Sequence, residues 1–206
     1  TGVRTDARHL PFVETAKNGD FDILFAGDSI TDWWQQAAPN GGADVQKKYC
    51  GDVKVANFAI AGDTTQGVLW GLQNGEGQGR KPKAVMLMIG TNNSNKEDNS
   101  EADILEGVRA IVKQMRERQP EMKVLVVGIF PRGQTFSTQR GKILQVNQAL
   151  AKLADGKMIH YVDFGSQLIE ADGSIAKSIM PDHLHLSERG YEIWAESIEG
   201  KLKELL

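Results

Sequence analysis

Phe21-Asp22-Ile23-Leu24-Phe25-Ala26-Gly27-Asp28-Ser29, residues 21–29, is the stretch that decides the fold. Its first six residues are almost all apolar, and the run then stops at Gly27-Asp28-Ser29. A nearly continuous apolar run is typical of a strand that is covered on both faces. Glycine and small polar residues directly after it indicate a tight turn. The stretch therefore predicts a buried strand that ends in a polar loop, as in α/β proteins.

Four further apolar runs resemble this one. They cover residues 53–60, 84–89, 124–130 and 158–164. Helical spacing of three and four residues appears between and after them, around Val108, Val146 and Trp194, with Ser187 as the expected N-cap of the last helix. Strands that alternate with helices predict a mostly parallel sheet with helices on both faces. Ligands of such sheets bind at the carboxyl ends of the strands.

Length and composition favour one globular domain. The chain has 206 residues, of which 40% are hydrophobic and 25% charged, and its formal net charge is −3. We expect one domain over residues 1–206, with its core at about 21–206 and residues 1–20 as an N-terminal lead-in. The negative charge gives no electrostatic reason to expect a nucleic-acid partner. The oligomeric state is open, and a homodimer is one option.

Several features are missing from the sequence. There is no apolar run of roughly 18 residues, so we expect no membrane span. Cys50 is the only cysteine, which rules out an intramolecular disulfide. Neither glycine-rich phosphate-binding motif occurs, and we expect no cofactor and no metal. No signal peptide is visible. If a leader has been removed, the protein is secreted or periplasmic, and otherwise it is cytoplasmic.

Polar motifs follow the predicted strands. Gly27-Asp28-Ser29 follows the first, Gly62-Asp63-Thr64 the second and Gly90-Thr91-Asn92-Asn93 the third, and Asp182-His183-Leu184-His185 lies near the C-terminus. Each has a purely structural interpretation when taken alone. Asp28 and Ser29 can form a turn, Gly62 can supply a positive φ, Asn92 can cap a helix and His185 can be a core histidine.

Together these motifs supply every group that acyl transfer requires. Ser29 is the candidate nucleophile and His185 the candidate base. Asp182 is three residues before His185, so the two side chains can share one side of a turn. The N–H groups of Ser29 and Gly62 and the side-chain amide of Asn92 are three candidate donors to an oxyanion. His183 is only one residue from Asp182 and is interpreted as a neighbour of the base.

The four motifs resemble those of the SGNH, or GDSL, hydrolase family from about Phe21 to the last helix. The resemblance implies a flavodoxin-like three-layer sandwich with five parallel strands in the order 2-1-3-4-5. It also implies Ser29, Asp182 and His185 as catalytic residues, and Ser29, Gly62 and Asn92 as the oxyanion hole. The blocks 57–66, 90–93 and 130–133 are similar to the catalytic subunits of platelet-activating factor acetylhydrolase Ib and their bacterial relatives. Ile30 stands where the family usually has Leu, and Asn93 where the wider family usually has Asp.

Substrate contacts are expected from residues near these motifs, namely Asp28, Trp33, Asp63, Thr64 and Arg132. Trp33 can stack on a sugar ring, line an acyl slot or pack under the first helix. Asp63 and Thr64 can bind substrate, although the structural role of fixing the Gly62 turn is favoured. Arg132 follows the fourth strand. It can bind an anionic group or a sugar, or have a surface or structural role.

Other functions are less favoured by the sequence than a serine esterase. A non-catalytic binding domain would need a missing triad group, and none is missing. A flavin- or phosphate-binding protein would need a glycine-rich motif. A zinc site at Asp182, His183 and His185 lacks a convincing further ligand. Among esterases, the expected substrate is a short acyl ester, most of all an acetyl ester of a carbohydrate. The alternative is a lipid-directed acylhydrolase or a thioesterase.

Overall fold

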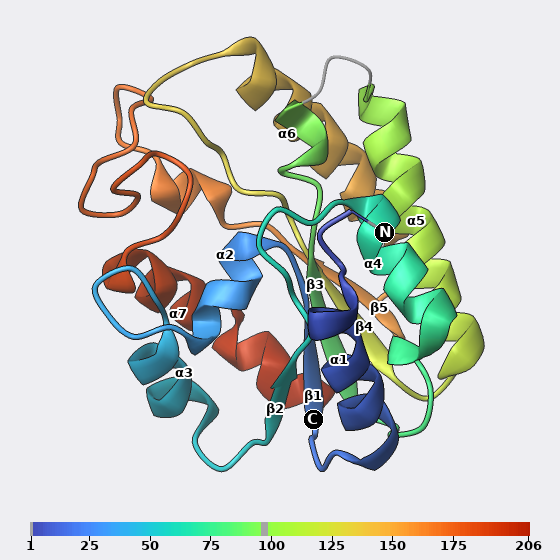
Figure 1. Cartoon of the computed structure of the whole chain (residues 1–206). Coiled ribbons are helices and arrows are strands. Elements are labelled where there is room, and N and C mark those ends of the chain that lie inside the picture. Colours follow the sequence, from blue (N-terminus) through green and yellow to red (C-terminus); the bar gives the residue numbers. More distant parts are fainter. Residues whose placement is uncertain (1, 96–98) are drawn as a thin grey trace.

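Five parallel strands form the central sheet, in the order β2-β1-β3-β4-β5. The protein is described as a computed structural model that covers residues 2–95 and 99–206 (Figure 1). The strands are β1 (Ile23–Gly27), β2 (Val55–Asn57), β3 (Ala84–Met88), β4 (Lys123–Val127) and β5 (Ile159–Val162). The strand order and the flanking helices confirm the predicted three-layer α/β fold.

Alternation along the strands divides the core in two. In β1, Leu24 faces one apolar cluster, and Ile23 and Phe25 face the other. All five residues of β1 and all five of β3 are buried, because helices cover both sides of the sheet. This explains why the strands read as continuous apolar runs in the sequence.

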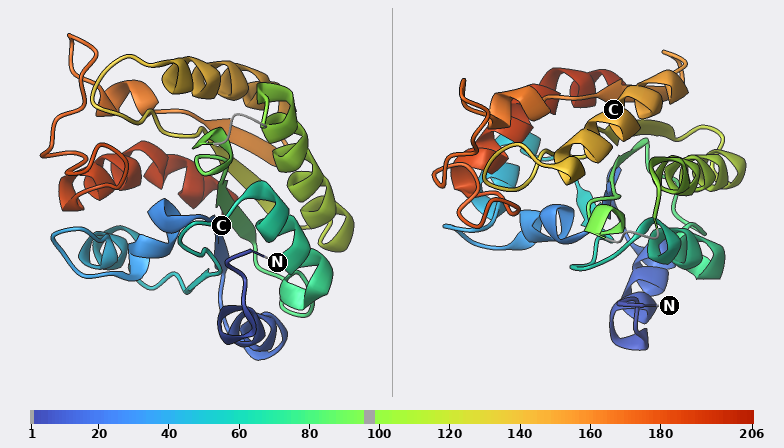
Figure 2. Two further views of the ribbon diagram at one scale, coloured as in Figure 1. Left: turned by 45° about the horizontal axis from the view of Figure 1, so that its top comes forward. Right: turned by 90° about the horizontal axis from the view of Figure 1, so that it is seen from above.

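Helices cover the two faces unequally. One cluster is built by α1 (Asp6–Asn18), α4 (Thr65–Gly71), α5 (Glu101–Arg118) and α6 (Thr138–Leu150). The other is built by α3 (Ala43–Cys50) and α7 (Glu188–Leu205). Figure 2 shows α3 and α7 on one side of the sheet and α4 and α5 on the other. The short helix α2 (Ser29–Asp32) directly follows β1.

Short helical turns complete the chain. They are η1 (Trp33–Gln35), η2 (Leu72–Glu76), η3 (Asn93–Asn95), η4 (Ala151–Leu153) and η5 (Gly165–Leu168). Side chains cap the long helices as their sequences suggest. The Ser187 side chain accepts a hydrogen bond from the Gly190 N–H at the start of α7, so the predicted N-cap is confirmed. Ser100 and Asp103 form a capping box at the start of α5.

The expected strands over 53–60, 124–130 and 158–164 are all shorter in the structure, where β4 ends at Val127 and β5 at Val162, and the second strand and the N-terminal segment differ most. The second strand was expected over residues 53–60, but β2 ends at Asn57. There the Asn57 side chain accepts from the Ala59 N–H and donates to the Thr31 carbonyl, and this redirects the chain toward α2. The segment 1–20 was expected to be a lead-in, but its described residues include the 13-residue helix α1. Residue 1 lies outside the described residues.

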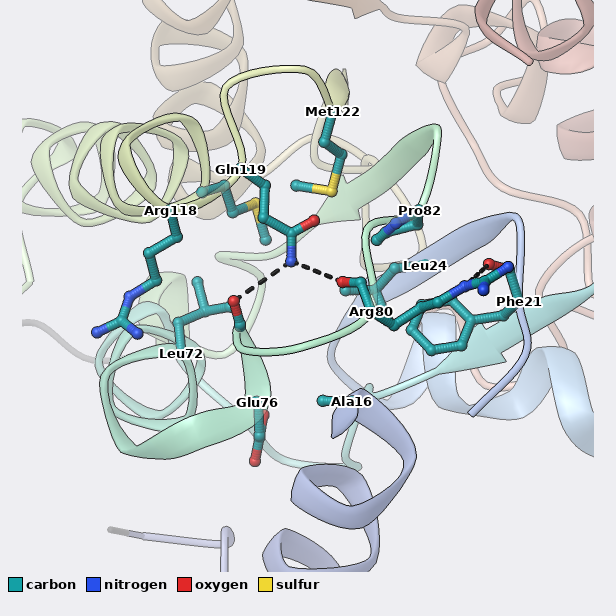
Figure 3. A pocket seen from close by; sticks show the side chains of 12 residues that line it. Ala16, Phe21, Leu24, Leu72, Glu76, Arg80, Pro82, Arg118, Gln119 and Met122 are labelled. Carbon is teal, nitrogen blue, oxygen red and sulfur yellow. Dashed lines mark hydrogen bonds between the residues drawn. The ribbon is translucent and has the colours of Figure 1, made fainter. Parts of the chain in front are cut away.

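The two edges of the sheet differ in character. A cavity of about 20 Å³ lies at the amino edge, near the starts of β1 and β4. Figure 3 shows Gln119 across it, donating to the carbonyls of Gly77 (3.3 Å) and Arg80 (3.0 Å). This space fits about one water molecule and no substrate. The C-terminus is at the same edge, where Lys123 Nζ donates to the Leu205 carbonyl. The chemistry-bearing motifs gather at the opposite, carboxyl edge.

No helix among residues 2–95 and 99–206 has the length and apolar character that crossing a bilayer requires.

Candidate active site

The turn after β1 places Ser29 at the first position of α2. Asp28 is the N-cap of this helix, and its Oδ1 accepts a hydrogen bond from the Ile30 N–H at 3.1 Å. Gly27 is required there, because a Cβ atom would lie 2.3 Å from the Met88 carbonyl oxygen. The Tyr191 hydroxyl donates to the Ile30 carbonyl at 2.7 Å and ties α2 to α7. Ser29 is therefore held on a short, firmly anchored turn.

The structure brings Ser29, His185 and Asp182 into one line. Ser29 Oγ is 2.9 Å from His185 Nε2, and His185 Nδ1 is 2.7 Å from Asp182 Oδ2. Both distances fall within ordinary hydrogen-bonding range. Ser29 is 6% exposed, whereas the Asp182 side chain is 54% exposed. The serine hydroxyl thus lies below the surface, and the carboxylate faces solvent.

A tight turn couples Asp182 to His185. Asp182 Oδ1 accepts hydrogen bonds from the N–H groups of Leu184 and His185, while Oδ2 holds the imidazole. Burial acts to raise the pKa of Asp182, but the hydrogen bonds from His185 and Leu184 outweigh it and hold that pKa below its usual value. His183 has a positive φ of 59°, and its Nδ1 donates to the Ile175 carbonyl instead. Of the two histidines, only His185 is near the serine.

The candidate oxyanion donors Gly62 and Asn92 lie together beside one cavity. Gly62 has a φ of +82°, which glycine adopts without strain. One amide hydrogen of Asn92 is used in a 2.8 Å bond to the Asp63 carbonyl. Because a primary amide has two N–H donors, the second remains available to a ligand. Both residues line a cavity of about 760 Å³, together with Thr64 and Gln66.

Three of the expected substrate contacts are half-buried near the site. Trp33 stacks on the His185 ring, with 4.0 Å between ring centroids. Thr64 lines the cavity. Arg132 donates to the Thr91 carbonyl at 3.3 Å. Burial lowers the pKa of the Arg132 guanidinium, and the charges of Asp28 and Asp182 oppose that shift.

The other two expected contacts, Asp28 and Asp63, are buried. The Asp28 side chain has no exposed surface, and its Oδ2 has no hydrogen-bond partner. Asp63 is 2% exposed, and its Oδ2 is 2.8 Å from Arg4 Nε. Both were interpreted as substrate contacts because they flank Ser29 and Gly62. Burial leaves these two carboxylates little or no surface, and Asp63 borders the cavity beside Gly62 and Asn92, so a contact of either with substrate stays a prediction.

Burial governs the protonation of Asp28. It raises the pKa of this carboxyl to about 7, and the Ile30 N–H bond opposes the shift only in part. Nearby charge has smaller effects, with Asp63 raising the pKa and Arg132 lowering it. A carboxyl group below the nucleophile is therefore poised between its neutral and ionised forms near neutral pH.

The N-terminal segment contributes buried charges that sequence reasoning did not single out. Arg4 is 1% exposed and contacts two carboxylates, Asp63 at 2.8 Å and Glu76 at 2.5 Å. It also donates to the Phe58 carbonyl. His9 Nδ1 is 2.7 Å from the other oxygen of Glu76. No local sequence signal marks Arg4 and His9, because their partners Asp63 and Glu76 lie far along the chain.

A second arginine links the same segment to the loop before Gly62. Arg8 Nη2 donates to Asp32 Oδ1 at 3.1 Å and to the Ala59 carbonyl at 3.0 Å. The other oxygen of Asp32 accepts from the Ala61 N–H. Helix α1 therefore holds both the end of α2 and the loop that leads to Gly62.

A match to a family model agrees with this geometry. Residues 25–193 match the model described as the GDSL-like lipase/acylhydrolase family. The matched range begins in β1 and includes the serine, the asparagine and the histidine discussed above. The chain belongs to the GDSL-like lipase/acylhydrolase family. It is a carboxylic ester hydrolase.

Known proteins from several organisms are similar to this GDSL-family chain. The platelet-activating factor acetylhydrolase IB subunit alpha1 of Homo sapiens is 35% identical over 199 residues, which cover 96% of this chain and 82% of the relative. A Streptococcus pneumonia structure with a provisional platelet activating factor description has a TM-score of 0.80 at 23% identity, over 96% of this chain and 92% of that chain. An acetylxylan esterase from Geobacillus stearothermophilus has a TM-score of 0.66 at 18% identity, over 90% and 94%. The two structural matches establish the shared fold.

Proposed function

We propose that the chain hydrolyses short acyl esters, acetyl esters above all, through an acyl-enzyme on Ser29. One observation carries the proposal, namely the continuous line of hydrogen bonds from Ser29 through His185 to Asp182. A hydroxyl, an imidazole and a carboxylate in this order are what an activated serine requires.

Formation of the acyl-enzyme follows from the geometry of the line. Asp182 keeps a proton on His185 Nδ1, so Nε2 can accept the proton of Ser29 as Oγ attacks the ester carbonyl carbon. The N–H groups of Ser29 and Gly62 and the free amide hydrogen of Asn92 would stabilise the oxyanion. His185 then gives the proton to the leaving alcohol oxygen as the C–O bond breaks.

Deacylation repeats the sequence with water. A water molecule attacks the acyl carbon while its proton passes to His185 Nε2, and Ser29 Oγ takes that proton back as it leaves. The products are one carboxylic acid and one alcohol, and the enzyme is restored. No cofactor is needed for either half of the reaction.

A carbohydrate is the proposed alcohol. The cavity beside Gly62 and Asn92 is bordered by polar side chains, including Thr64, Gln66 and Asn95. Hydroxyl and amide groups suit the neutral hydroxyls of a sugar, which both donate and accept hydrogen bonds. An acetylxylan esterase with the same fold offers a precedent of the same kind.

An acetylated phospholipid is the second candidate. The observation that favours it is the name of the relative at 35% identity, a platelet-activating factor acetylhydrolase subunit. Both candidates share the acetyl group and differ only in the alcohol, so one assay can separate them. The alternative of an acylhydrolase for longer chains, or of a thioesterase, has less support than either acetyl ester.

The test is acetate release from acetylated oligosaccharides and from an acetylated phospholipid, measured in parallel. We expect the wild type to act on the sugar, Ser29→Ala to lose turnover by orders of magnitude, and Ser197→Ala to match the wild type. Ser197 is a suitable control because its hydroxyl bonds only to α7 and η5. A fluorophosphonate should label Ser29. Full activity of Ser29→Ala would refute the mechanism, and release from the phospholipid alone would refute the carbohydrate.

A further inference from the structure

One turn of backbone presents two side chains to His185. Trp33 is four residues after Ser29, and its backbone N–H donates to the Ser29 carbonyl at the end of α2. Residues with this spacing share a face of a helical turn. The His185 imidazole contacts both Ser29 and Trp33. Its Nε2 is 2.9 Å from Ser29 Oγ, and its ring lies 4.0 Å from the Trp33 ring at an interplanar angle of 21°.

The hydrogen bonds of His185 leave one motion of its ring unrestrained. His185 bonds Ser29 through Nε2 and Asp182 through Nδ1. The two hydrogen bonds therefore hold the imidazole roughly along the axis from one ring nitrogen to the other. They oppose sliding of the ring but not tilting about that axis. A flat surface against one face of the ring prevents the tilt. The near-parallel indole of Trp33 is such a surface.

The charge that forms on His185 needs a partner besides Asp182. The Asp182 side chain is 54% exposed, whereas His185 is 19% exposed. Attraction to an exposed carboxylate is weakened by water. An aromatic face attracts a cation more strongly when the pair is shielded from solvent.

We propose that Trp33 is a positioning residue that fixes the plane of the His185 ring and stabilises the imidazolium formed when Ser29 gives up its proton. The inference rests on the proposed function, in which His185 is the base. It assigns Trp33 a role in the chemical step rather than in sugar binding.

Other charged groups also act near His185, and they set the background for the Trp33 effect. Asp182 belongs to the same turn, Asp28 is the buried N-cap of α2, and Arg132 follows β4. The charge of Arg132 acts on both carboxylates. None of these groups is altered by a substitution at Trp33, so a comparison among Trp33 variants isolates the indole.

The first experiment compares Trp33→Phe with Trp33→Leu. Leucine removes the aromatic face and phenylalanine keeps one. We expect kcat of Trp33→Leu to fall about tenfold, in line with a cation–π contact in a partly shielded site, while KM stays within about twofold. Trp33→Phe should retain most of the activity. If Trp33 were instead a platform for the sugar, KM would rise and kcat would hold, and that result would overturn the proposal.

The second experiment needs no activity. In a Ser29→Ala background, the protonation of the histidine rings is followed by NMR against pH, with and without Trp33→Leu. The midpoint for His185 should move down by about half a pH unit or more when the indole is lost, because the imidazolium loses a stabilising partner. His183 is the internal control, since its Nδ1 bonds to the Ile175 carbonyl.

The two experiments fail in different ways. An unchanged His185 midpoint, or equal kcat losses in the Phe and Leu variants, would overturn the role of Trp33. Neither result would touch the role of Ser29, which fails only if Ser29→Ala stays active. A midpoint shift with an active Ser29→Ala would leave the Trp33 contact in place and remove the proposed function.

Discussion

The side-chain amide of Asn93 forms hydrogen bonds that connect two segments of the site. Its Oδ1 accepts from the Thr65 N–H at 3.0 Å, and its Nδ2 donates to Thr65 Oγ1 and Gln66 Oε1. A carboxylate at this position could accept but could not donate. The amide therefore ties the start of α4 to the loop that carries Asn92, and the departure from the usual Asp of the wider family has a structural reason.

Asn92 provides the sharpest test of the oxyanion hole. In Asn92→Ala the side-chain donor is lost while Ser29, His185 and Asp182 stay in place. Removal of one such donor costs about 2.7–4 kcal/mol of barrier, so kcat should fall by about 10²–10³-fold and KM much less. The measurement is steady-state kinetics on a nitrophenyl acetate. Asn18→Ala is the control, because that exposed amide bonds only Glu14. An unchanged kcat in Asn92→Ala would exclude the assigned donor.

Asp28 should make stability depend on pH. Its pKa is about 7 in the folded protein, and about 3.9 is usual for an unfolded chain. Between these values the folded state binds more protons, so this group lowers stability as pH rises through that window. Asp28→Asn keeps the acceptor for the Ile30 N–H and carries no charge. Its stability relative to the wild type should increase from pH 4 to pH 7, by up to about 4 kcal/mol.

Urea unfolding at several pH values measures this difference. The expected signature is a gap between variant and wild type that widens with pH and levels off above about pH 7. A constant gap would mean that Asp28 keeps the same charge in both states across the window.

The N-terminal segment acts on the site through Arg4, which lies just before α1 and is not a proposed catalytic group. Arg4→Met would leave Asp63 and Glu76 buried without their cation. Loss of one partner of a buried ion pair typically costs about 3–5 kcal/mol. The exposed pair of Arg109 and Glu106 on α5 is the matched control, and Arg109→Met should cost less than about 1 kcal/mol. Denaturant midpoints measure both. Equal small losses would show that Arg4 is dispensable to the fold.

Elements differ in how visible they are in the sequence. The strands are apolar on both faces and α5 and α7 carry regular apolar stripes, so all of these were predicted. Helix α1 was not, because it contains Pro11 and buries only His9 and Ala16 fully. Its attachment depends on ion pairs with residues far along the chain, and no local pattern encodes such partners. The same holds for β2, which is ended by the Asn57 side chain rather than by a turn residue.

In the candidate site, too, some features were predictable from the sequence and others were not. Ser29, Gly62 and Asn92 follow strands, so topology placed all three at the carboxyl edge; Gly62 and Asn92 border one cavity, and their convergence on Ser29 stays a prediction. The spacing of Asp182 and His185 predicted their contact. The burial of Asp28 and Asp63 was not predictable, since it depends on Arg4 and on the packing under α2. The stack of Trp33 on His185 joins residues 152 positions apart and needed the three-dimensional structure.

In the whole molecule, the proposed catalytic residues lie at the carboxyl edge of the sheet and not at the amino edge. The carboxyl edge carries the serine, the histidine and the cavity of about 760 Å³ beside Gly62 and Asn92, and the cavity near the starts of β1 and β4 at the amino edge measures about 20 Å³. This cavity is wide and has many polar side chains in its lining, so it is not the narrow apolar tunnel that would hold a long acyl chain. Each methylene would be worth about 0.8 kcal/mol in an apolar tunnel and far less here.

Acyl-chain selectivity is therefore the prediction for the molecule as a whole. Across nitrophenyl acetate, butyrate, hexanoate and octanoate, kcat/KM should be highest for acetate and fall steeply beyond butyrate. Oligomeric state should be recorded in the same samples by light scattering, because a homodimer remains a prediction. A specificity constant that rises toward octanoate would favour a lipid-directed enzyme or a thioesterase.

The two ends of the chain leave the fold at opposite edges. Gly2 and Val3 border the cavity beside Gly62 and Asn92, whereas the C-terminal carbonyls reach Lys123 at the start of β4. A bulky fusion partner or a solid support joined next to Gly2 would crowd this cavity, which is the proposed substrate site. Attachment through the carboxyl end would turn the opening toward free solution. For immobilised use on large, insoluble polymers, that choice of tether decides which way the enzyme faces.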